Sequence, residues 1–196
     1  MLKLYHAPDS RSSRFIWLLE ELGADYEPVR CTIQRRSGAG APDPRNPHPD
    51  KRVPALEHDG QLITEQAAIA LYLTDLFRQS PIGAPPGSPD RGAYLTWLAF
   101  HAGEIDVAYN TRALGLGTAE PTVLRDHRRV AERVAAALAK GPFLLGARFT
   151  AADILASGPF EWDPELGARS PVIVDWVGRL AARPAAARMR ALDAEG

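Results

Sequence analysis

Residues 2–23 read LKLYHAPDSRSSRFIWLLEELG, and this stretch decides the fold of the chain. Its first residues alternate between apolar and polar and then meet Ala-Pro-Asp-Ser at 7–10, which predicts a strand that runs into a turn. After the turn, apolar residues recur at i, i+3, i+4 and i+7, the spacing of an amphipathic helix: Phe15, Leu18, Leu19 and Leu22. Gly23 is placed to end that helix at its C-terminus.

The sequence downstream extends this pattern into a small mixed sheet. Residues 26–32 are compatible with a second strand, and residues 35–49, rich in Arg, Gly, Ala and Pro, are expected to form a mobile loop. Asp59-Gly60 stands between two short alternating runs, which is a strong local signal for a hairpin. A helical stripe then follows at Ile69, Tyr72, Leu73 and Leu76. The expected order is therefore strand, helix, strand, loop, two strands and helix.

The second half of the chain differs from the first in its composition and in its secondary-structure signals. Residues 79–87 contain three prolines and two glycines, the composition of a linker, and strand signals nearly vanish beyond them. Two long helices are expected there, the second over about residues 121–140. The stretch 149–154, FTAADI, carries an N-cap threonine with an acid three residues later, a capping signature. We expect three parts: a domain of residues 1–78, a linker of residues 79–87 and an all-helical domain of residues 88–196.

Composition and charge exclude several classes of protein. The chain has 196 residues and a formal net charge of -1, which removes any global electrostatic case for binding nucleic acid or an anionic membrane. Its longest apolar runs fall far short of the roughly 18 residues that a membrane span needs, and its first residues lack the apolar stretch of a signal peptide. The single cysteine, Cys31, fits a reducing cytoplasm. The sequence contains no metal-ligand spacing, phosphate-binding loop or nucleophile elbow.

The turn around Ser10 is the first place where the sequence suggests chemistry. A helix N-terminus presents unpaired N–H groups and a positive dipole end, which favour an anion such as a thiolate or a carboxylate. Residues 9–14, DSRSSR, add three hydroxyls and two guanidinium groups at that position. The competing interpretation is that one serine only caps the helix.

Two further segments carry both a structural and a functional interpretation. Pro54 is either an ordinary trans proline that starts an edge strand or a cis proline that exposes the backbone of Val53 to a bound peptide. Glu65 and Gln66 either suit the first turn of a helix or bind an ammonium group and a carboxylate, respectively. Each signal is weak alone, and their order along the chain is what matters.

Four segments resemble the cytosolic glutathione transferases in order and spacing: 4–14 (LYHAPDSRSSR), 53–56 (VPAL), 65–73 (EQAAIALYL) and 149–154 (FTAADI). The resemblance covers essentially the whole chain and is to bacterial, serine-type members with a theta- or zeta-like active site. It implies an α/β thioredoxin-like N-terminal domain, an all-α C-terminal domain and a cytoplasmic homodimer. It also implies a detoxifying transferase that activates glutathione as a thiolate for addition to a small hydrophobic electrophile. Glutathione is then a cosubstrate, and no prosthetic group is expected.

The same resemblance implies a catalytic residue. Ser10 takes the place of the serine that donates a hydrogen bond to the glutathione sulfur, with Ser12 and Ser13 as fallback candidates, and Ser12 is also a candidate glutathione contact. Contacts to the second substrate are expected from the long helix after the linker: Phe100, His101 or Tyr109.

The remaining glutathione contacts are implied by the other matching segments. Val53-Pro54 resembles the cis-proline element that pairs with the cysteinyl part of glutathione, and Glu65 matches the acid that holds the γ-glutamyl end. Arg52 stands where the family often has a basic or amide side chain for the glycyl carboxylate. Gln66 departs from the family's usual serine, although its amide can still donate to a carboxylate.

Other functions stay open from the sequence. Glutathione-dependent isomerisation or peroxide reduction would use the same thiolate, and a non-catalytic binding or interaction scaffold would keep the fold without the activity. A thiol–disulfide oxidoreductase is disfavoured, because residues 10–13 occupy the turn where a Cys-x-x-Cys motif would sit and Cys31 stands alone.

Overall fold

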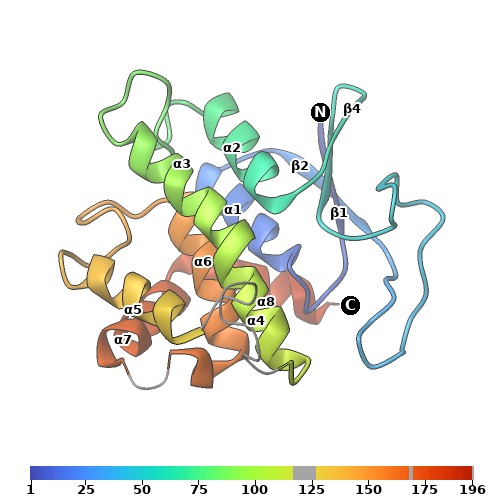
Figure 1. Ribbon diagram of the computed structural model, residues 1–196. Coiled ribbons are helices and arrows are strands. Elements are labelled where there is room, and N and C mark those ends of the chain that lie inside the picture. Colours follow the sequence, from blue (N-terminus) through green and yellow to red (C-terminus); the bar gives the residue numbers. More distant parts are fainter. Residues whose placement is uncertain (117–126, 168–169, 196) are drawn as a thin grey trace. The chain divides into compact units, whose positions relative to one another are not determined.

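The computed structural model describes residues 1–116, 127–167 and 170–195. The chain divides into two compact units, of which the first comprises Met1–Leu73 with Pro184–Gly196 and the second Thr74–Arg183. Figure 1 shows the sheet in the first unit and the helices of both units. In the part of the chain that the structure describes, no helix is both long and apolar enough to cross a membrane.

The first unit is built on a four-stranded mixed sheet with the strand order β2-β1-β3-β4. β1 (Leu2–His6) pairs in parallel with β2 (Tyr26–Arg30) and antiparallel with β3 (Ala55–His58). β3 continues through a tight turn into β4 (Gln61–Ile63). The turn residues Asp59 and Gly60 have φ angles of 49° and 79°, as a two-residue hairpin turn requires. The hairpin and the order of elements predicted from the sequence are confirmed.

Helix α1 (Ser13–Leu22) carries the apolar stripe that the sequence predicts. Its core-facing residues from Phe15 to Leu19 are almost completely buried. The helix ends at Gly23, whose left-handed φ of 62° is accessible to glycine without steric penalty. α2 (Gln66–Leu76) follows β4, and the division between the two units falls within it.

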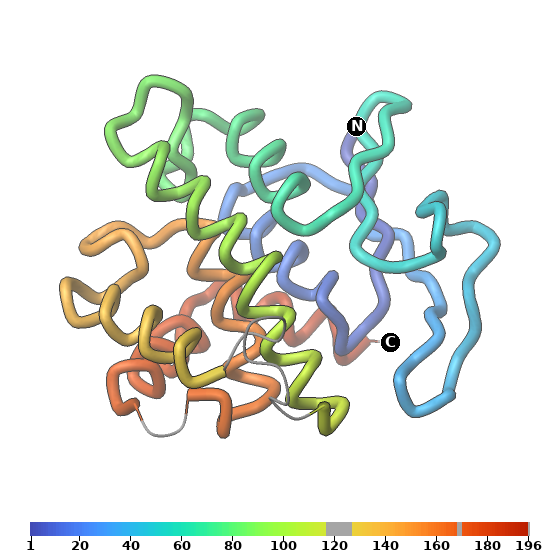
Figure 2. The backbone as a smooth tube through the Cα atoms, viewed as in Figure 1, coloured from blue at the N-terminus to red at the C-terminus, as the bar shows by residue number. Residues whose placement is uncertain are grey.

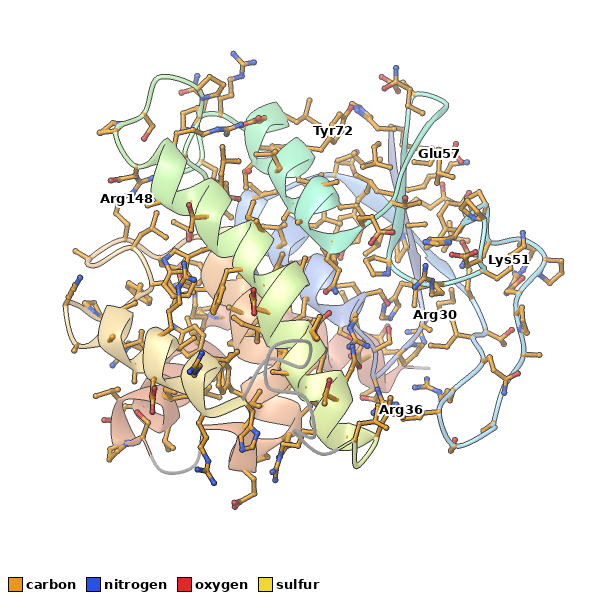
Figure 3. All side chains as sticks on the ribbon, in the orientation of Figure 1. Arg30, Arg36, Lys51, Glu57, Tyr72 and Arg148 are labelled. Atoms are coloured by element: carbon orange, nitrogen blue, oxygen red, sulfur yellow. The ribbon has the colours of Figure 1, made fainter. Side chains whose placement is uncertain are left out.

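The C-terminal helix α8 (Pro184–Ala194) belongs to the first unit, where it packs against α1. Arg188 on α8 pairs with Glu20 on α1 at 2.6 Å, and Arg30, labelled in Figure 3, donates to the carbonyl of Leu192 at 2.6 Å. The sequence analysis assigned residues 184–196 to the helical domain instead. That assignment differs because a local pattern predicts a helix but does not identify the surface on which the helix packs.

The long connection between β2 and β3, residues 31–54, has no regular secondary structure (Figure 2). It nevertheless has an interior of its own, because Asp43, Asn46 and His48 are buried. Asp43 accepts a hydrogen bond from the backbone N–H of Thr32 at 3.2 Å, and Asn46 Nδ2 donates to the carbonyl of Arg52 at 2.9 Å. These contacts fix the path of the chain into β3.

The described part of the second unit is helical and contains seven labelled elements. They are α3 (Arg91–Phe100), the π-helical turn η1 (His101–Ile105), α4 (Asp106–Ala113), α5 (His127–Leu138), α6 (Ala151–Trp162), the 3-10 turn η2 (Pro164–Leu166) and α7 (Pro171–Ala181). The helix predicted over 121–140 corresponds to α5, and its expected first residues, 121–126, lie outside the described residues. The prediction that this half is helical is confirmed for those elements.

A single buried carboxylate, that of Asp153, organises the N-terminus of α6. Its Oδ2 accepts from the backbone N–H and the hydroxyl of Thr150, which confirms the predicted capping signature. Its Oδ1 accepts from the backbone N–H of Leu144 at 2.9 Å and from the indole of Trp176 at 3.1 Å. Asp153 therefore ties α6 to the preceding loop and to α7.

The buried carboxyl group of Asp153 should make part of the free energy of unfolding decrease as the pH rises. Burial raises the pKa of Asp153 to about 6, although its hydrogen bonds oppose that rise. At pH values between the pKa of Asp153 in the unfolded chain and its higher pKa in the folded protein, the native state binds up to one more proton than the unfolded chain. The free energy of unfolding therefore decreases by about 3 kcal/mol as the pH rises through this range. Asp153→Asn cannot titrate and should lack this component. Urea unfolding of both proteins at several values between about pH 4 and 7 measures the difference, and parallel curves would contradict it.

Candidate active site

The strand register brings three separate segments to one edge of the sheet. β1 and β3 are antiparallel, with Tyr5 opposite Ala55, so the end of β1 lies beside the start of β3. β3 and β4 are antiparallel, with Leu56 opposite Ile63, so the end of β4 lies at the same edge. The turn after β1, the residues before β3 and the residues after β4 therefore meet there. These are the three segments that the sequence analysis selected in the first half of the chain.

Ser10 lies in the turn between β1 and α1, close to the N-terminus of that helix. It is partly exposed. Its hydroxyl donates to the carbonyl of Ala7 at 2.7 Å and lies 2.7 Å from Ser12 Oγ. Its oxygen also accepts from the backbone N–H of Ser12 at 3.2 Å. Ser10 thus has a hydroxyl near solvent at the positive end of a helix.

Ser12 and Ser13 are in a different environment, because both are buried. Ser12 Oγ lies 2.9 Å from His6 Nδ1 and accepts from the backbone N–H of Ala7 at 3.1 Å, so it ties the end of β1 to the start of α1. Ser13 Oγ accepts from the backbone N–H of Ser10 at 3.4 Å. Of the three serines, Ser10 is the one whose surroundings leave it partly open to a ligand.

The peptide bond between Val53 and Pro54 is cis. Taken alone, this segment favours a trans proline, whereas the family resemblance implies the cis form that the structure has. Pro54 is buried directly before β3, and Val53 packs against a small cluster of Tyr5, Cys31 and Ala55. Val53 therefore lies just before the first residue of β3, beside the end of β1.

Glu65 adopts an unusual backbone conformation at the start of α2. Its φ is 66°, in the left-handed region, which is unfavourable by about 1–2 kcal/mol for a residue with a Cβ. Its carbonyl accepts from the backbone N–H of Ile69 at 2.9 Å, so Glu65 begins the helix while its side chain stays exposed. Gln66, the first helical residue, is partly buried. Strain of this kind in a folded protein clusters at functional sites.

Arg52 is exposed and forms an ion pair with Asp50 at 2.7 Å. Both side chains are about two-thirds exposed, at 68% and 64%, so this pair is a weak one that a ligand carboxylate can replace.

The three candidates for the second substrate lie in the second unit. Phe100 and His101 are buried, and Phe100 packs edge-on against Trp97 with ring centroids 5.5 Å apart. Tyr109 is partly exposed and packs against Trp162 at 5.7 Å. Within this unit, Phe100 and His101 are core residues, and Tyr109 is the more accessible of the three.

Two polar residues that the sequence analysis did not select lie behind Ser12. They are His6, at the end of β1, and Asp193, on α8, whose Oδ1 is 3.1 Å from His6 Nε2. Burial raises the pKa of Asp193, but hydrogen bonds from His6 and Ser13 outweigh burial and leave that pKa below its ordinary value. His6 lies in residues 2–23, the stretch that decides the fold. No pattern in the sequence indicates that Asp193, which is far away along the chain, is its partner. Among the described residues, no group of three or more metal-binding side chains is assembled.

Comparison with known proteins gives a consistent result over both halves of the chain. The family model described as "Glutathione S-transferase, N-terminal domain" matches residues 1–75, and that described as "Glutathione S-transferase, C-terminal domain" matches residues 117–184. Glutathione S-transferase GstA of Escherichia coli O157:H7 is 30% identical over 165 residues, which cover 82% of each chain.

Solved structures agree with the family models. A glutathione transferase from Methylococcus capsulatus str. Bath has a TM-score of 0.80 at 31% identity and covers all of both chains. A sphingomonad glutathione S-transferase, solved in complex with glutathione, has a TM-score of 0.77 at 27% identity over 99% of this chain and 100% of its own. The two-part fold, thioredoxin-like and then helical, is therefore confirmed.

The contrast between Ser10 and Ser12 predicts that their substitution by alanine lowers stability by different amounts. Ser12→Ala removes the partner of the buried Ala7 N–H and of His6, and should lower the free energy of unfolding by about 2 kcal/mol. Ser10→Ala removes a partly exposed hydroxyl that accepts from the Ser12 N–H and donates to the Ala7 carbonyl, and should lower it by less, about 1 kcal/mol. Urea unfolding followed by circular dichroism measures both values. A larger loss for Ser10→Ala than for Ser12→Ala would reverse the assignment.

Proposed function

Because the chain belongs to the glutathione S-transferase family and is a glutathione transferase enzyme, we propose that it activates glutathione as a thiolate and adds it to a small hydrophobic electrophile. The observation that carries the proposal is the Ser10 hydroxyl, partly exposed at the N-terminal end of α1. It stands at the sheet edge to which the register also brings Val53-Pro54 and Glu65.

The chemical task at Ser10 is to lower a thiol pKa. A free thiol with a pKa near 8.5 is mostly neutral at pH 7, and each unit of lowering corresponds to about 1.4 kcal/mol. A hydroxyl donor and a helix N-terminus can together supply that amount. For this purpose the Ser10 proton turns from the Ala7 carbonyl to the sulfur. The thiol proton passes to water, and the thiolate sulfur then forms a bond to the electrophilic carbon. With an aryl halide the carbon–halogen bond breaks and halide leaves; with an activated alkene the π electron pair moves to the neighbouring carbon, which takes a proton from water.

The other residues of the edge would orient glutathione. The backbone of Val53, which precedes β3 at this edge of the sheet, would pair with the cysteinyl unit. The exposed carboxylate of Glu65 suits the γ-glutamyl ammonium group, and Gln66 can donate to the neighbouring carboxylate. Arg52 would exchange Asp50 for the glycyl carboxylate. Such positioning lowers the entropic cost of bringing the sulfur and the electrophile together in the reactive geometry.

The wider assignment is part of the same proposal. The partners are glutathione and the electrophile in a cytoplasmic homodimer, and Tyr109 is the most accessible of the residues considered for the electrophile. The sphingomonad relative, solved with glutathione, supports a glutathione site rather than a non-catalytic scaffold. Cys31 is buried, and burial raises its pKa, as in an unreactive thiol. This argues against disulfide exchange at that residue.

Glutathione binding is expected to depend on Glu65. Titration calorimetry should show saturable binding to the wild-type protein, and Glu65→Ala should weaken it about tenfold or more through loss of one charge-assisted contact. Glu27→Ala is a matched control, since Glu27 is also exposed but lies on β2, the outer strand at the other side of the sheet. Absence of binding at millimolar glutathione would instead favour the scaffold interpretation.

We expect Ser10 to contribute more to catalysis than to the binding of glutathione. Ser10→Ala should lower kcat about 10²-fold, because its hydrogen bond is made to the charge of the thiolate, while the glutathione dissociation constant changes little. Ser37→Ala, in the exposed loop of the same unit, should leave both values unchanged. Steady-state conjugation rates with a reactive aryl halide measure kcat. Equal rates for Ser10→Ala and the wild type would remove Ser10 from the mechanism.

A further inference from the structure

Four polar side chains form a continuous row from Ser10 into the interior of the first unit. Ser10 Oγ lies 2.7 Å from Ser12 Oγ, and Ser12 Oγ lies 2.9 Å from His6 Nδ1. His6 Nε2 lies 3.1 Å from Asp193 Oδ1. The row therefore begins at the partly exposed serine and ends at a carboxylate on the C-terminal helix α8.

The inner members of this row are shielded from water. Ser12 is fully buried, His6 is 1% exposed, and the Asp193 side chain is 11% exposed. Buried polar groups are costly unless their hydrogen bonds are satisfied within the protein. The direction of each hydrogen bond among the two serines and His6 is consequently set by its neighbours rather than by solvent. His6 Nε2 and Asp193 Oδ1 face each other at ion-pair distance, and neither has a geometric hydrogen-bond partner among the described residues.

The proton count at the two serines links Ser10 to His6. A hydroxyl donates one hydrogen bond, so the 2.7 Å contact needs the Ser12 proton when Ser10 donates to the glutathione sulfur. Ser12 then donates to Ser10 rather than to the Ala7 carbonyl, which lies farther from it, at 3.2 Å. Ser12 then has no proton left for His6 and must accept from it. In that arrangement Ser12 also accepts from the Ala7 N–H, so its donor and both acceptor positions are filled.

The same count links His6 to Asp193. His6 must donate from Nδ1 to Ser12, while its Nε2 faces a carboxylate, which when ionised can only accept. In the proposed arrangement both ring nitrogens would carry a proton, and the Asp193 carboxylate, 3.1 Å from Nε2, would balance that charge. Asp193 is itself held in place, because it accepts from the backbone N–H of Asp9 at 3.4 Å and from Ser13.

We propose that His6 and Asp193 are positioning residues of the thiolate site: together they turn the Ser12 hydroxyl, and through it the Ser10 hydroxyl, toward the glutathione sulfur. The inference rests on the role proposed above for Ser10. It assigns the last helix of the chain, α8, a part in the chemistry of the N-terminal unit. Without the Asp193 charge, a neutral His6 keeps its proton on Nε2, Nδ1 becomes an acceptor, and Ser12 turns inward.

The test is a double-mutant cycle of Asp193→Asn and Ser10→Ala. The thiol pKa of bound glutathione is read from ultraviolet thiolate absorbance against pH, and kcat and the glutathione dissociation constant are measured beside it. Asp193→Asn should raise the bound thiol pKa by about one unit and lower kcat about tenfold at neutral pH, with the dissociation constant little changed. In the Ser10→Ala background, Asp193→Asn should have no further effect on the thiol pKa.

Two controls separate positioning from simple loosening of α8. Arg188→Gln breaks the 2.6 Å ion pair with Glu20 that also joins α8 to α1, but it leaves the row intact, so the thiol pKa should not move. At His6, Asn and Leu have nearly the same shape, yet only Asn can donate to Ser12. His6→Asn should therefore retain more of the thiol pKa shift than His6→Leu. If Asp193→Asn fails to fold, the comparison of His6→Asn with His6→Leu tests the positioning role instead.

The outcomes distinguish the two proposals. A thiol pKa that shifts in Ser10→Ala but not in Asp193→Asn overturns the role of His6 and Asp193 and leaves that of Ser10 intact. An effect of Asp193→Asn that is the same in both backgrounds, or that Arg188→Gln reproduces, also overturns it. A thiol pKa unchanged in Ser10→Ala removes the proposed role of Ser10 itself, and the positioning role with it.

Discussion

The antiparallel pairing of β1 with β3, with Tyr5 opposite Ala55, is the contact on which the candidate active site depends. The pairing places the end of the first strand beside the cis Val53-Pro54 bond, and the hairpin from β3 to β4 returns the chain to that edge at Glu65. A shift of one residue would turn every side chain of the strand to the other face of the sheet. The buried faces of β1 and β3 therefore hold the site in register.

Buried polar groups fix the details that apolar packing leaves undetermined. In the first unit Ser12 joins the end of β1 to the start of α1, and in the second unit Asp153 joins α6 to α7. Apolar contacts are non-directional, whereas a buried hydroxyl or carboxylate must find donors and acceptors at set positions. Each of these residues stands at the N-terminus of a helix, where backbone N–H groups need partners.

A transferase that lowers a thiol pKa with a neutral hydroxyl depends on the direction of that hydroxyl. Ser10 donates to the Ala7 carbonyl at 2.7 Å, so a glutathione sulfur would compete with that carbonyl for the Ser10 proton. The residues behind it therefore matter as much as its own position. Because α8 belongs to the first unit, Asp193 lies 3.1 Å from the ring of His6, behind Ser12.

The sequence by itself determined the order of the elements, the Asp59-Gly60 hairpin and the capping of α6, because turn geometry and helix periodicity act over a few neighbouring residues. It also marked the segments that meet at the site. Only the tertiary structure decided which serine is partly exposed, that Val53-Pro54 is cis, and that α8 brings Asp193 to His6. These features depend on contacts between residues far apart in the chain, and their spacing in the sequence carries no record of such contacts.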